Sequence, residues 1–508
     1  MTKRTASGDL WTAYEAAAAT GGALCARGGD ADHWIAEEWA ASGVSIDTRS
    51  LKPGEIFVAL QDARDGHAFL KNAFEAGAAA ALVARAPEDA PEGAPLLVVR
   101  DTLQGLRDLA AAARLRNFGK RIAVTGSVGK TGTKEMLRAM LGASASVHAA
   151  DRSFNNHWGV PLTLASLPMH ADYAVFEIGM NHAGEIAPLA TMVRPHAAIV
   201  TTVGTAHIEN LGSREAIAEA KAEIFQGLAR GGVAVLPRDN DFFALLKQRA
   251  EEAGAAGFVT FGEHEDADFR LMDYDLAGAG GRVAARIKGA SRAFEIGAPG
   301  RHHAVNALAA LAAVDAVGAP LEPAIAALAG LRPVEGRGAR AVLKLADGEA
   351  VLIDESYNAN PESMTAAIGL LGAAAPAGAG RRIAVLGEML ELGPDAPAMH
   401  AGLVDALVAA KVDRVYATGA NMRHLWDALP AAMRGLYADA AVGLVGPVLD
   451  AAGPGDVIMV KGSNASQASA IARALRAHGS GGVQGGKDVH DVQGADPRGG
   501  VTRKESKT

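Results

Sequence analysis

The chain has 508 residues, enough for three domains, and its 49 Lys and Arg against 57 Asp and Glu give a net charge of −8. No basic excess is available to neutralise phosphates, which argues against nucleic acid as the main partner. The single cysteine, Cys25, excludes an internal disulfide and a cysteine-based zinc site, and it fits a reducing cytoplasm.

Nothing in the hydrophobic pattern indicates a membrane protein. The most apolar stretch, 304–331, is interrupted by polar residues and a proline, whereas a span needs about 20 mostly apolar residues. The first residues also lack the apolar core of a signal peptide. We therefore expect a cytoplasmic protein without a membrane anchor.

Short apolar runs and helical spacing alternate in the first section, 1–98. The runs at 55–60 and 79–84 are of strand length, and 69–76 between them has helical spacing. A Pro-, Gly- and acid-rich linker at 86–95 precedes another strand beginning at Pro95. We place the first domain boundary close to residue 98.

The second section, 99–332, alternates buried strands with helices. We expect strands at 121–125, 173–178, 197–203 and 232–236, and helices at 102–116, 213–228 and 303–317. This alternation predicts an α/β domain with a mainly parallel sheet covered by helices on both faces.

The third section, 333–478, repeats this style. The expected strands are 350–354, 382–386, 414–418 and 457–461. Ligands in open α/β sheets bind at the carboxyl ends of the strands. The segment 479–508 has almost no large apolar residues, so we expect a disordered tail there.

A glycine-rich phosphate-binding sequence is the strongest local signal. It follows the strand 121–125 and precedes a helix expected to start near Lys134; its members are Gly126, Ser127, Val128, Gly129, Lys130, Thr131 and Gly132. Such a loop turns backbone N–H groups toward an anion, with the lysine on the β- and γ-phosphates and the threonine hydroxyl on Mg²⁺. The strict pattern has glycine at position 124, where this chain has valine, so the alternative is a glycine turn with a chance GKT.

Two polar residues follow predicted strands. Glu177 ends the strand 173–178 and is placed to hold Mg²⁺, although a solvated strand-end acid would look the same. His207 lies in the loop after 197–203, where a histidine is as often structural as catalytic.

A lysine also interrupts an apolar helical stripe. Lys221 lies among Ile217, Ala220, Ile224 and Leu228. Either its aliphatic chain packs against the core while the ammonium reaches solvent, or its amine lies in a functional site. The residues alone do not separate these interpretations.

The loop after the strand 350–354 combines an acid, an aromatic ring and two asparagines. Asp354 could hold a ribose and Tyr357 a base, whereas an Asn/Pro turn is the structural alternative.

Taken together, these segments resemble the Mur ligases, the ATP-dependent amide ligases of peptidoglycan synthesis. The resemblance extends from about residue 44 to 464 and rests on VSIDTRS, TGSVGKTGTKEM, FNNHWGVPLTL, EIGMNHAGEI, GTAHIENLGSREAIAEAKAEIF and DESYNANPESM, in that order. It implies three domains: a small α/β domain for the UDP-linked substrate (1–98), a central P-loop ATPase domain (99–332) and a C-terminal Rossmann-like domain (333–478).

The resemblance also implies roles for individual residues. Lys130, His207 and Lys221 would be catalytic; Thr131, Glu177, His207 and a carbamylated Lys221 would hold Mg²⁺. Together with the phosphate loop, Asn306, Arg337, Asp354, Tyr357 and Asn358 would bind ATP, and Ser45, Asp47, Thr48 and Arg49 would bind the uridine substrate. Closure of the third domain over the central one would align the reactants.

Within the family, the resemblance is to the member that joins D-Ala-D-Ala to a UDP-N-acetylmuramoyl-tripeptide, and we expect a monomer. Alternatives are a sister Mur ligase, a folylpolyglutamate synthetase or a non-catalytic nucleotide-binding P-loop module. This sequence departs from the family pattern at Ser153, His303, Glu355, Glu388 and Asn464. The third residue of the tripeptide, diaminopimelate or lysine, is not determined.

Overall fold

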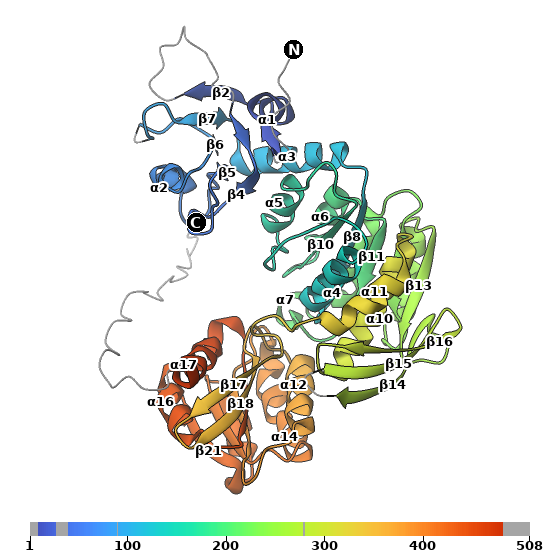
Figure 1. Cartoon of the computed structure of the whole chain (residues 1–508), viewed down its shortest axis with the longest axis vertical. Coiled ribbons are helices and arrows are strands. Elements are labelled where there is room, and N and C mark those ends of the chain that lie inside the picture. Colours follow the sequence, from blue (N-terminus) through green and yellow to red (C-terminus); the bar gives the residue numbers. More distant parts are fainter. Residues whose placement is uncertain (1–8, 27–38, 89, 278–279, 481–508) are drawn as a thin grey trace, which may run out of the picture.

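A computed structural model describes residues 9–26, 39–88, 90–277 and 280–480. Three sheets with their helices follow one another along the long axis of the molecule, in chain order (Figure 1). Each sheet is mainly parallel in its centre, which confirms the expected α/β class. The boundaries expected near residues 98 and 332 stay predictions.

The first section contains a five-stranded sheet of order β2-β7-β6-β5-β4. Its strands are β2 (Ala23–Ala26), β4 (Gly43–Ser45), β5 (Glu55–Val58), β6 (Ala80–Val83) and β7 (Pro95–Val98). The helices are α1 (Ala13–Thr20) and α2 (Leu70–Glu75), and a short ribbon pairs β1 (Trp11–Thr12) with β3 (Ala40–Ala41). A capping box between Thr12 and Glu15 starts α1.

The middle section holds a nine-stranded sheet of order β16-β15-β14-β13-β12-β11-β8-β10-β9. The parallel strands are β8 (Lys120–Thr125), β9 (Val147–Ala149), β10 (Tyr173–Glu177), β11 (Ala197–Val200), β12 (Val233–Pro237), β13 (Gly257–Gly262) and β14 (Phe269–Ala277). Two antiparallel strands, β15 (Gly280–Ile287) and β16 (Ala290–Ile296), extend one edge.

Helices cover both faces of this sheet (Figure 1). They are α3 (Thr102–Arg116), α4 (Lys130–Gly142), α5 (Gly159–Ala165), α6 (Ile186–Val193), α7 (Ile208–Leu211), α8 (Arg214–Ala222), α9 (Phe243–Glu252), α10 (Arg301–Ala316) and α11 (Leu321–Ala327). Successive residues of β8 point into two different cores: Ile122 and Val124 toward α4 and α10, and Ala123 toward the other face.

The third section has a six-stranded sheet of order β17-β18-β22-β19-β20-β21. Its strands are β17 (Ala339–Leu345), β18 (Gly348–Glu355), β19 (Arg382–Gly387), β20 (Arg414–Thr418), β21 (Arg434–Ala438) and β22 (Val457–Lys461); only β17 is antiparallel to its neighbour. The helices are α12 (Pro361–Ala373), α13 (Ala396–Ala401), α14 (Leu403–Ala409), α15 (Met422–Ala428), α16 (Val442–Ala451) and α17 (Ala468–Ser480).

Three local expectations differ from the structure. Helix α4 begins at Lys130 and not near Lys134. The helix expected at 213–228 ends at Ala222 and continues as a 3₁₀ turn (Glu223–Gly227), which brings Gly227 so close to Ala190 that a Cβ would lie 2.2 Å from its backbone. The strands from 257 to 296 were not predicted.

The disordered tail expected at 479–508 falls almost wholly outside the described residues, since α17 ends at Ser480. No helix in the described part of the chain is both long and apolar enough to cross a lipid bilayer.

Helix α10 is central to the middle core, and this gives a stability prediction. Leu308 is fully buried there, so Leu308→Ala should lower the free energy of unfolding by about 3 kcal/mol through lost burial and the cavity left behind. Chemical denaturation followed by circular dichroism would measure it. Leu115→Ala, at a site 69% exposed on α3, should change stability little; equal losses in both variants would contradict the assigned packing.

Candidate active site

A cavity of about 1600 Å³ lies between the middle and third sections. One wall is the glycine-rich loop between β8 and α4 together with the end of β10. The other wall comes from the segment after β18, the end of β22 and the start of α12. The carboxyl ends of parallel strands from two sheets therefore face the same space, as expected for a ligand site in α/β folds.

The glycine-rich loop depends on two glycines with positive φ. Gly126 (φ +147°) lies so close to Thr201 that a Cβ would be 1.9 Å from its hydroxyl oxygen. Gly129 (φ +87°) faces the side-chain amide of Asn306, where a Cβ would be 2.8 Å from Nδ2. The first residues of α4 line the cavity directly after the loop, so their N–H groups, which have no partner within the helix, are available to an anion there.

Two lysines on α4 have different surroundings. The Lys130 ammonium donates to the Gly126 carbonyl over 2.6 Å and lines the cavity; burial lowers its pKa, against the opposing charge of Glu177. Lys134, four residues further along α4, is buried and donates to the carbonyl of Ala150. Of these two lysines, Lys130 is the one placed to meet a phosphate.

Glu177 is the buried carboxylate at the end of β10. It accepts hydrogen bonds from Thr131 (2.8 Å), Ser153 (2.6 Å) and Asn155 (2.9 Å). Burial raises its pKa, but the charge of Lys130 and these hydrogen bonds outweigh burial and hold the pKa below its usual value. The carboxylate is thus ionised at neutral pH.

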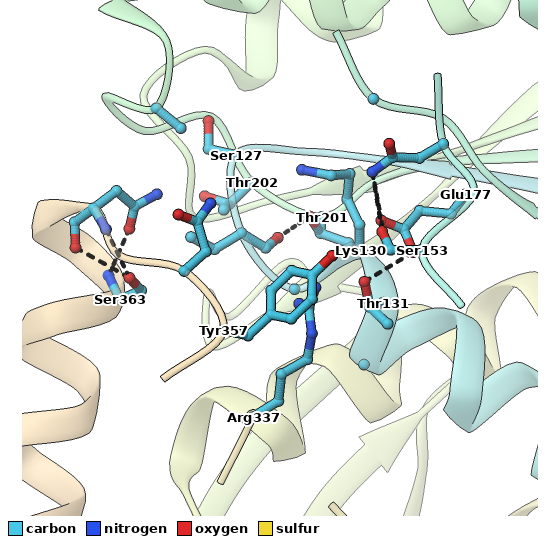
Figure 2. A pocket seen from close by; sticks show the side chains of 18 of the residues that line it. Ser127, Lys130, Thr131, Ser153, Glu177, Thr201, Thr202, Arg337, Tyr357 and Ser363 are labelled. Atoms are coloured by element: carbon cyan, nitrogen blue, oxygen red, sulfur yellow. Dashed lines mark hydrogen bonds between the residues drawn. The ribbon is translucent and has the colours of Figure 1, made fainter. Parts of the chain in front are cut away.

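This group of oxygens fits Mg²⁺. Among the described residues, no set of three or more His, Cys, Asp or Glu side chains is placed to hold a metal ion. Glu177 with the hydroxyls of Thr131 and Ser153 instead offers one carboxylate and neutral oxygens, the kind of partial set that Mg²⁺ uses when phosphates complete its shell (Figure 2).

His207 and Lys221 are not among the hydrogen-bond partners of Glu177, but the charge of Lys130 acts on both of them. His207 lines the cavity, and its Nδ1 is hydrogen-bonded to Glu391 of the third section. Burial lowers the pKa of His207, against the opposing effect of Glu391. Lys221 is fully buried and is not part of the cavity wall; burial and the charge of Lys130 hold its pKa well below the ordinary value.

An aromatic and cationic platform lies across the cavity from the glycine-rich loop. The Arg337 guanidinium stacks over the Tyr357 ring at 3.9 Å. Figure 2 shows this pair between the Lys130–Glu177 group and the α12 side of the pocket. Asn306 and Asn358 also line the cavity, so four of the five expected nucleotide residues outside the loop are brought together.

Asp354 is the exception. It is buried outside the cavity wall, where Ser356 (2.6 Å) and Arg476 (2.7 Å) bind its carboxylate. The expected contact with a ribose stays a prediction. Its neighbour Glu355 lines the cavity instead, 3.7 Å from Lys461. Burial raises the pKa of Glu355 despite the lysine.

The residues expected to bind uridine lie apart, at the end of β4 and in the turn that follows it. The Asp47 carboxylate binds Arg49 at 2.7 Å, and the hydrogen bond from this guanidinium lowers the pKa of Asp47. The Ser45 hydroxyl donates to the Asp47 carbonyl, and Thr48 lies in the same turn. None of these four described residues lines the large cavity. A ligand that they bind would have to extend from the first section to reach it.

Comparisons with known proteins agree with this geometry. The family models "Mur ligase middle domain" and "Mur ligase, glutamate ligase domain" match residues 124–314 and 340–464. The chain is 38% identical over 385 residues to the UDP-N-acetylmuramoyl-tripeptide–D-alanyl-D-alanine ligase of Bacillus subtilis, covering 75% of this chain and 81% of that one. The chain belongs to the Mur ligase family.

Further relatives cover most of the chain. The Escherichia coli ligase of the same name is 37% identical over 440 residues, 86% of this chain and 94% of that protein. A crystal structure of MurF from Acinetobacter baumannii has a TM-score of 0.77 at 29% identity and covers 92% and 99% of the two chains. MurF of Thermotoga maritima in complex with ADP has a TM-score of 0.71 at 25% identity, with 86% and 98% covered.

The departures from the Mur ligase pattern fall into different surroundings. The Ser153 hydroxyl donates a hydrogen bond to the Glu177 carboxylate, so a side-chain oxygen is present beside this group. His303 lines the cavity, and its ring is tilted by 43° to that of His302 with 4.1 Å between the ring centroids. Both ring nitrogens of His303 are buried without a hydrogen-bond partner among the described residues. Asn464 is exposed on the wall, and Glu388 accepts from the backbone of Asn421.

Sequence reasoning missed some cavity residues. Asn155 bonds Glu177 and Lys461 donates to the Asn358 carbonyl over 2.9 Å. Each had a signal: Asn155 lies in the FNNHWG segment, and Lys461 closes a predicted strand. Their partners lie far away in sequence, so the pairing itself was not visible.

The close approach at Gly126 generates a prediction. Gly126→Ala should push Thr201 and the loop apart and weaken ADP binding at least about tenfold, since the phosphate cradle is lost while the core is untouched. Isothermal titration calorimetry measures the Kd. Gly142→Ala, at the far end of α4 with no atom within 4 Å, should bind like the parent chain; unchanged affinity in both variants would refute the phosphate-loop assignment.

Proposed function

We propose that this chain is an ATP-dependent ligase that joins D-Ala-D-Ala to a UDP-N-acetylmuramoyl-tripeptide, in the cytoplasmic stage of peptidoglycan synthesis. The observation that carries the proposal is the ionised, buried Glu177 beside Lys130, at the bottom of a cavity closed by the third section. Relatives that carry this name align over most of the chain, including the glycine-rich loop.

The reaction has two steps. The terminal carboxylate of the tripeptide attacks the γ-phosphorus of ATP, and the bond to the β-phosphate oxygen breaks, giving an acyl phosphate and ADP. The amine of D-Ala-D-Ala, after losing a proton, then attacks the acyl carbon, and phosphate leaves as the amide forms. Two anions must meet in the first step, so cationic groups at the phosphates are essential.

Different residues would bind the phosphates, Mg²⁺ and the base of ATP. Lys130 would move from the Gly126 carbonyl to the β- and γ-phosphates, and the first N–H groups of α4 would bind the same oxygens. Glu177, Thr131 and Ser153 would hold Mg²⁺, which offsets negative charge on the phosphoryl group when bound. The Arg337–Tyr357 platform would stack on the base, with Asn306 and Asn358 on its edges.

The uridine end would lie at Ser45, Asp47, Thr48 and Arg49, and the peptide would extend toward the cavity. The Arg49 side chain is exposed but paired with Asp47, so its guanidinium would exchange this carboxylate for a diphosphate on binding. A monomeric state and a cytoplasmic location remain predictions of the sequence.

Lys221 would act as a carbamate. Burial and the charge of Lys130 hold the pKa of this amine well below its ordinary value, which makes the neutral form more accessible. The lone pair of that form can attack CO₂, and loss of one proton leaves a carboxylate-like group. That group would suit a second Mg²⁺, shared with His207, where an ammonium would repel the ion.

Phosphate release measures the proposed reaction. Release should require ATP, the UDP-tripeptide and D-Ala-D-Ala together. Lys130→Ala should lower turnover at least about a hundredfold by removing one charge contact in the transition state, whereas Lys71→Ala, exposed on α2, should not. Nucleotide binding without turnover would favour a binding module; activity with a single amino acid or with a folate would favour a sister ligase or a folylpolyglutamate synthetase.

The carbamate has its own test. Lys221→Ala should be nearly inactive, and short-chain carboxylic acids should restore part of its activity by supplying the missing oxygens. Lys221→Arg should not respond, because its guanidinium still fills the space. A modest loss in Lys221→Ala, without rescue by acids, would show that the lysine is structural.

A further inference from the structure

The third section touches the middle section through the carboxylate of Glu362, in the first turn of α12. Its Oε1 accepts the backbone N–H of Thr205 over 2.7 Å, and its Oε2 accepts the Thr205 hydroxyl at 3.2 Å. The same carboxylate lies against Gly204, where a Cβ would be 2.6 Å from Oε1. The loop therefore places the hydrogen-bond donors of Thr205 next to Gly204, whose missing side chain leaves room for the Glu362 carboxylate.

The loop that receives Glu362 is bonded to the phosphate-binding loop. The Gly204 N–H donates to the Ser127 hydroxyl (2.9 Å), and the Ser127 N–H donates to the Thr202 carbonyl (2.9 Å). The Thr201 hydroxyl donates to the Val128 carbonyl over 2.5 Å. A shift of the glycine-rich loop upon binding phosphates would thus be felt directly at the Glu362 contact.

A second contact reinforces the first from the same loop. His207 is hydrogen-bonded to the Glu391 carboxylate, and the Glu209 N–H donates to the Glu391 carbonyl. His207 (φ +67°) and Glu391 (φ +62°) both hold left-handed backbone conformations, which cost energy for residues other than glycine. Strained residues facing each other across an interface indicate a contact that is maintained by its surroundings.

We infer that Glu362 is a positioning residue that holds the third section closed over the phosphate-binding loop, coupling nucleotide binding to domain closure. The inference rests on the proposed function for its activity readout, but not for its geometry. Glu362 lies on the segment that also carries Tyr357 and Asn358, and a capping box between Asn360 and Ser363 fixes the start of its helix. Docking Glu362 on Thr205 thereby places the nucleotide platform opposite Lys130.

Two variants and one control test this role. Glu362→Ala removes both acceptors, whereas Glu362→Gln keeps an oxygen for the Thr205 N–H and should recover part of the function. Glu322→Ala is the matched control: Glu322 is also an acid in the first turn of a helix, but its partner Arg292 lies in the same section.

Closure can be measured without catalysis. Spin labels at Glu251→Cys on α9 and Val442→Cys on α16, in a Cys25→Ser background, report the distance between the sections by double electron–electron resonance. With Mg²⁺ and a non-hydrolysable ATP analogue, the parent chain and Glu322→Ala should give one narrow distance. Glu362→Ala should give a longer, broader distribution, with Glu362→Gln between them.

The variant should change kcat but not substrate binding. Glu362→Ala should lower kcat about tenfold or more, as loss of hydrogen bonds to a charged group misplaces the reactants, while the Kd for the UDP-tripeptide stays the same. Closure and kcat in Glu362→Ala equal to those of the parent would overturn the inference. If the label distances respond to Glu362 but no ligation occurs in the parent, the proposed function fails and the closing contact stands.

Discussion

An ionised carboxylate held inside the protein is the constraint on which the rest of the site depends. A buried charge is tolerated only where other charges and hydrogen bonds compensate for lost water. At Glu177 these come from Lys130, from the helix that follows the glycine-rich loop, and from Ser153 and Asn155. Lys130, the start of that helix and Ser153 are also the groups proposed to meet phosphate or Mg²⁺, so the arrangement that stabilises the buried carboxylate is the one that these ligands would need.

Much of this organisation could be predicted because it is local. The strand 414–418 and the helix 102–116 agree with β20 and α3 residue for residue, since their apolar runs are closed by clear end signals. The glycine-rich loop was recognisable because two glycines, a lysine and a threonine must follow a strand at fixed spacing. The family segments added roles that spacing alone left open, as at Lys221.

What the sequence alone leaves undetermined has physical causes. Asp354 and Glu355 are neighbours on β18, and successive side chains of a strand point to opposite faces. The sequence indicates an acid at this strand end but not which of the two acids faces the cavity. Asp354 pairs with Arg476, which lies on a helix distant in sequence. The 3₁₀ turn after α8 was likewise missed, because it depends on the approach of Gly227 to Ala190.

The sections of this Mur ligase are not joined alike. One continuous apolar core includes Ile56 of the first sheet and Phe176 of the middle sheet, and the Trp11 indole donates to the Ala165 carbonyl across that junction. The cores around the third sheet are separate, and Glu362 and Glu391 of the third section contact the loop of the middle section through polar groups. The first and middle sections are therefore joined as one body, and the third section is attached to them through polar contacts. A substrate that reached from the turn after β4 to the glycine-rich loop would have to match a fixed distance between them, so its length would be part of how it is selected.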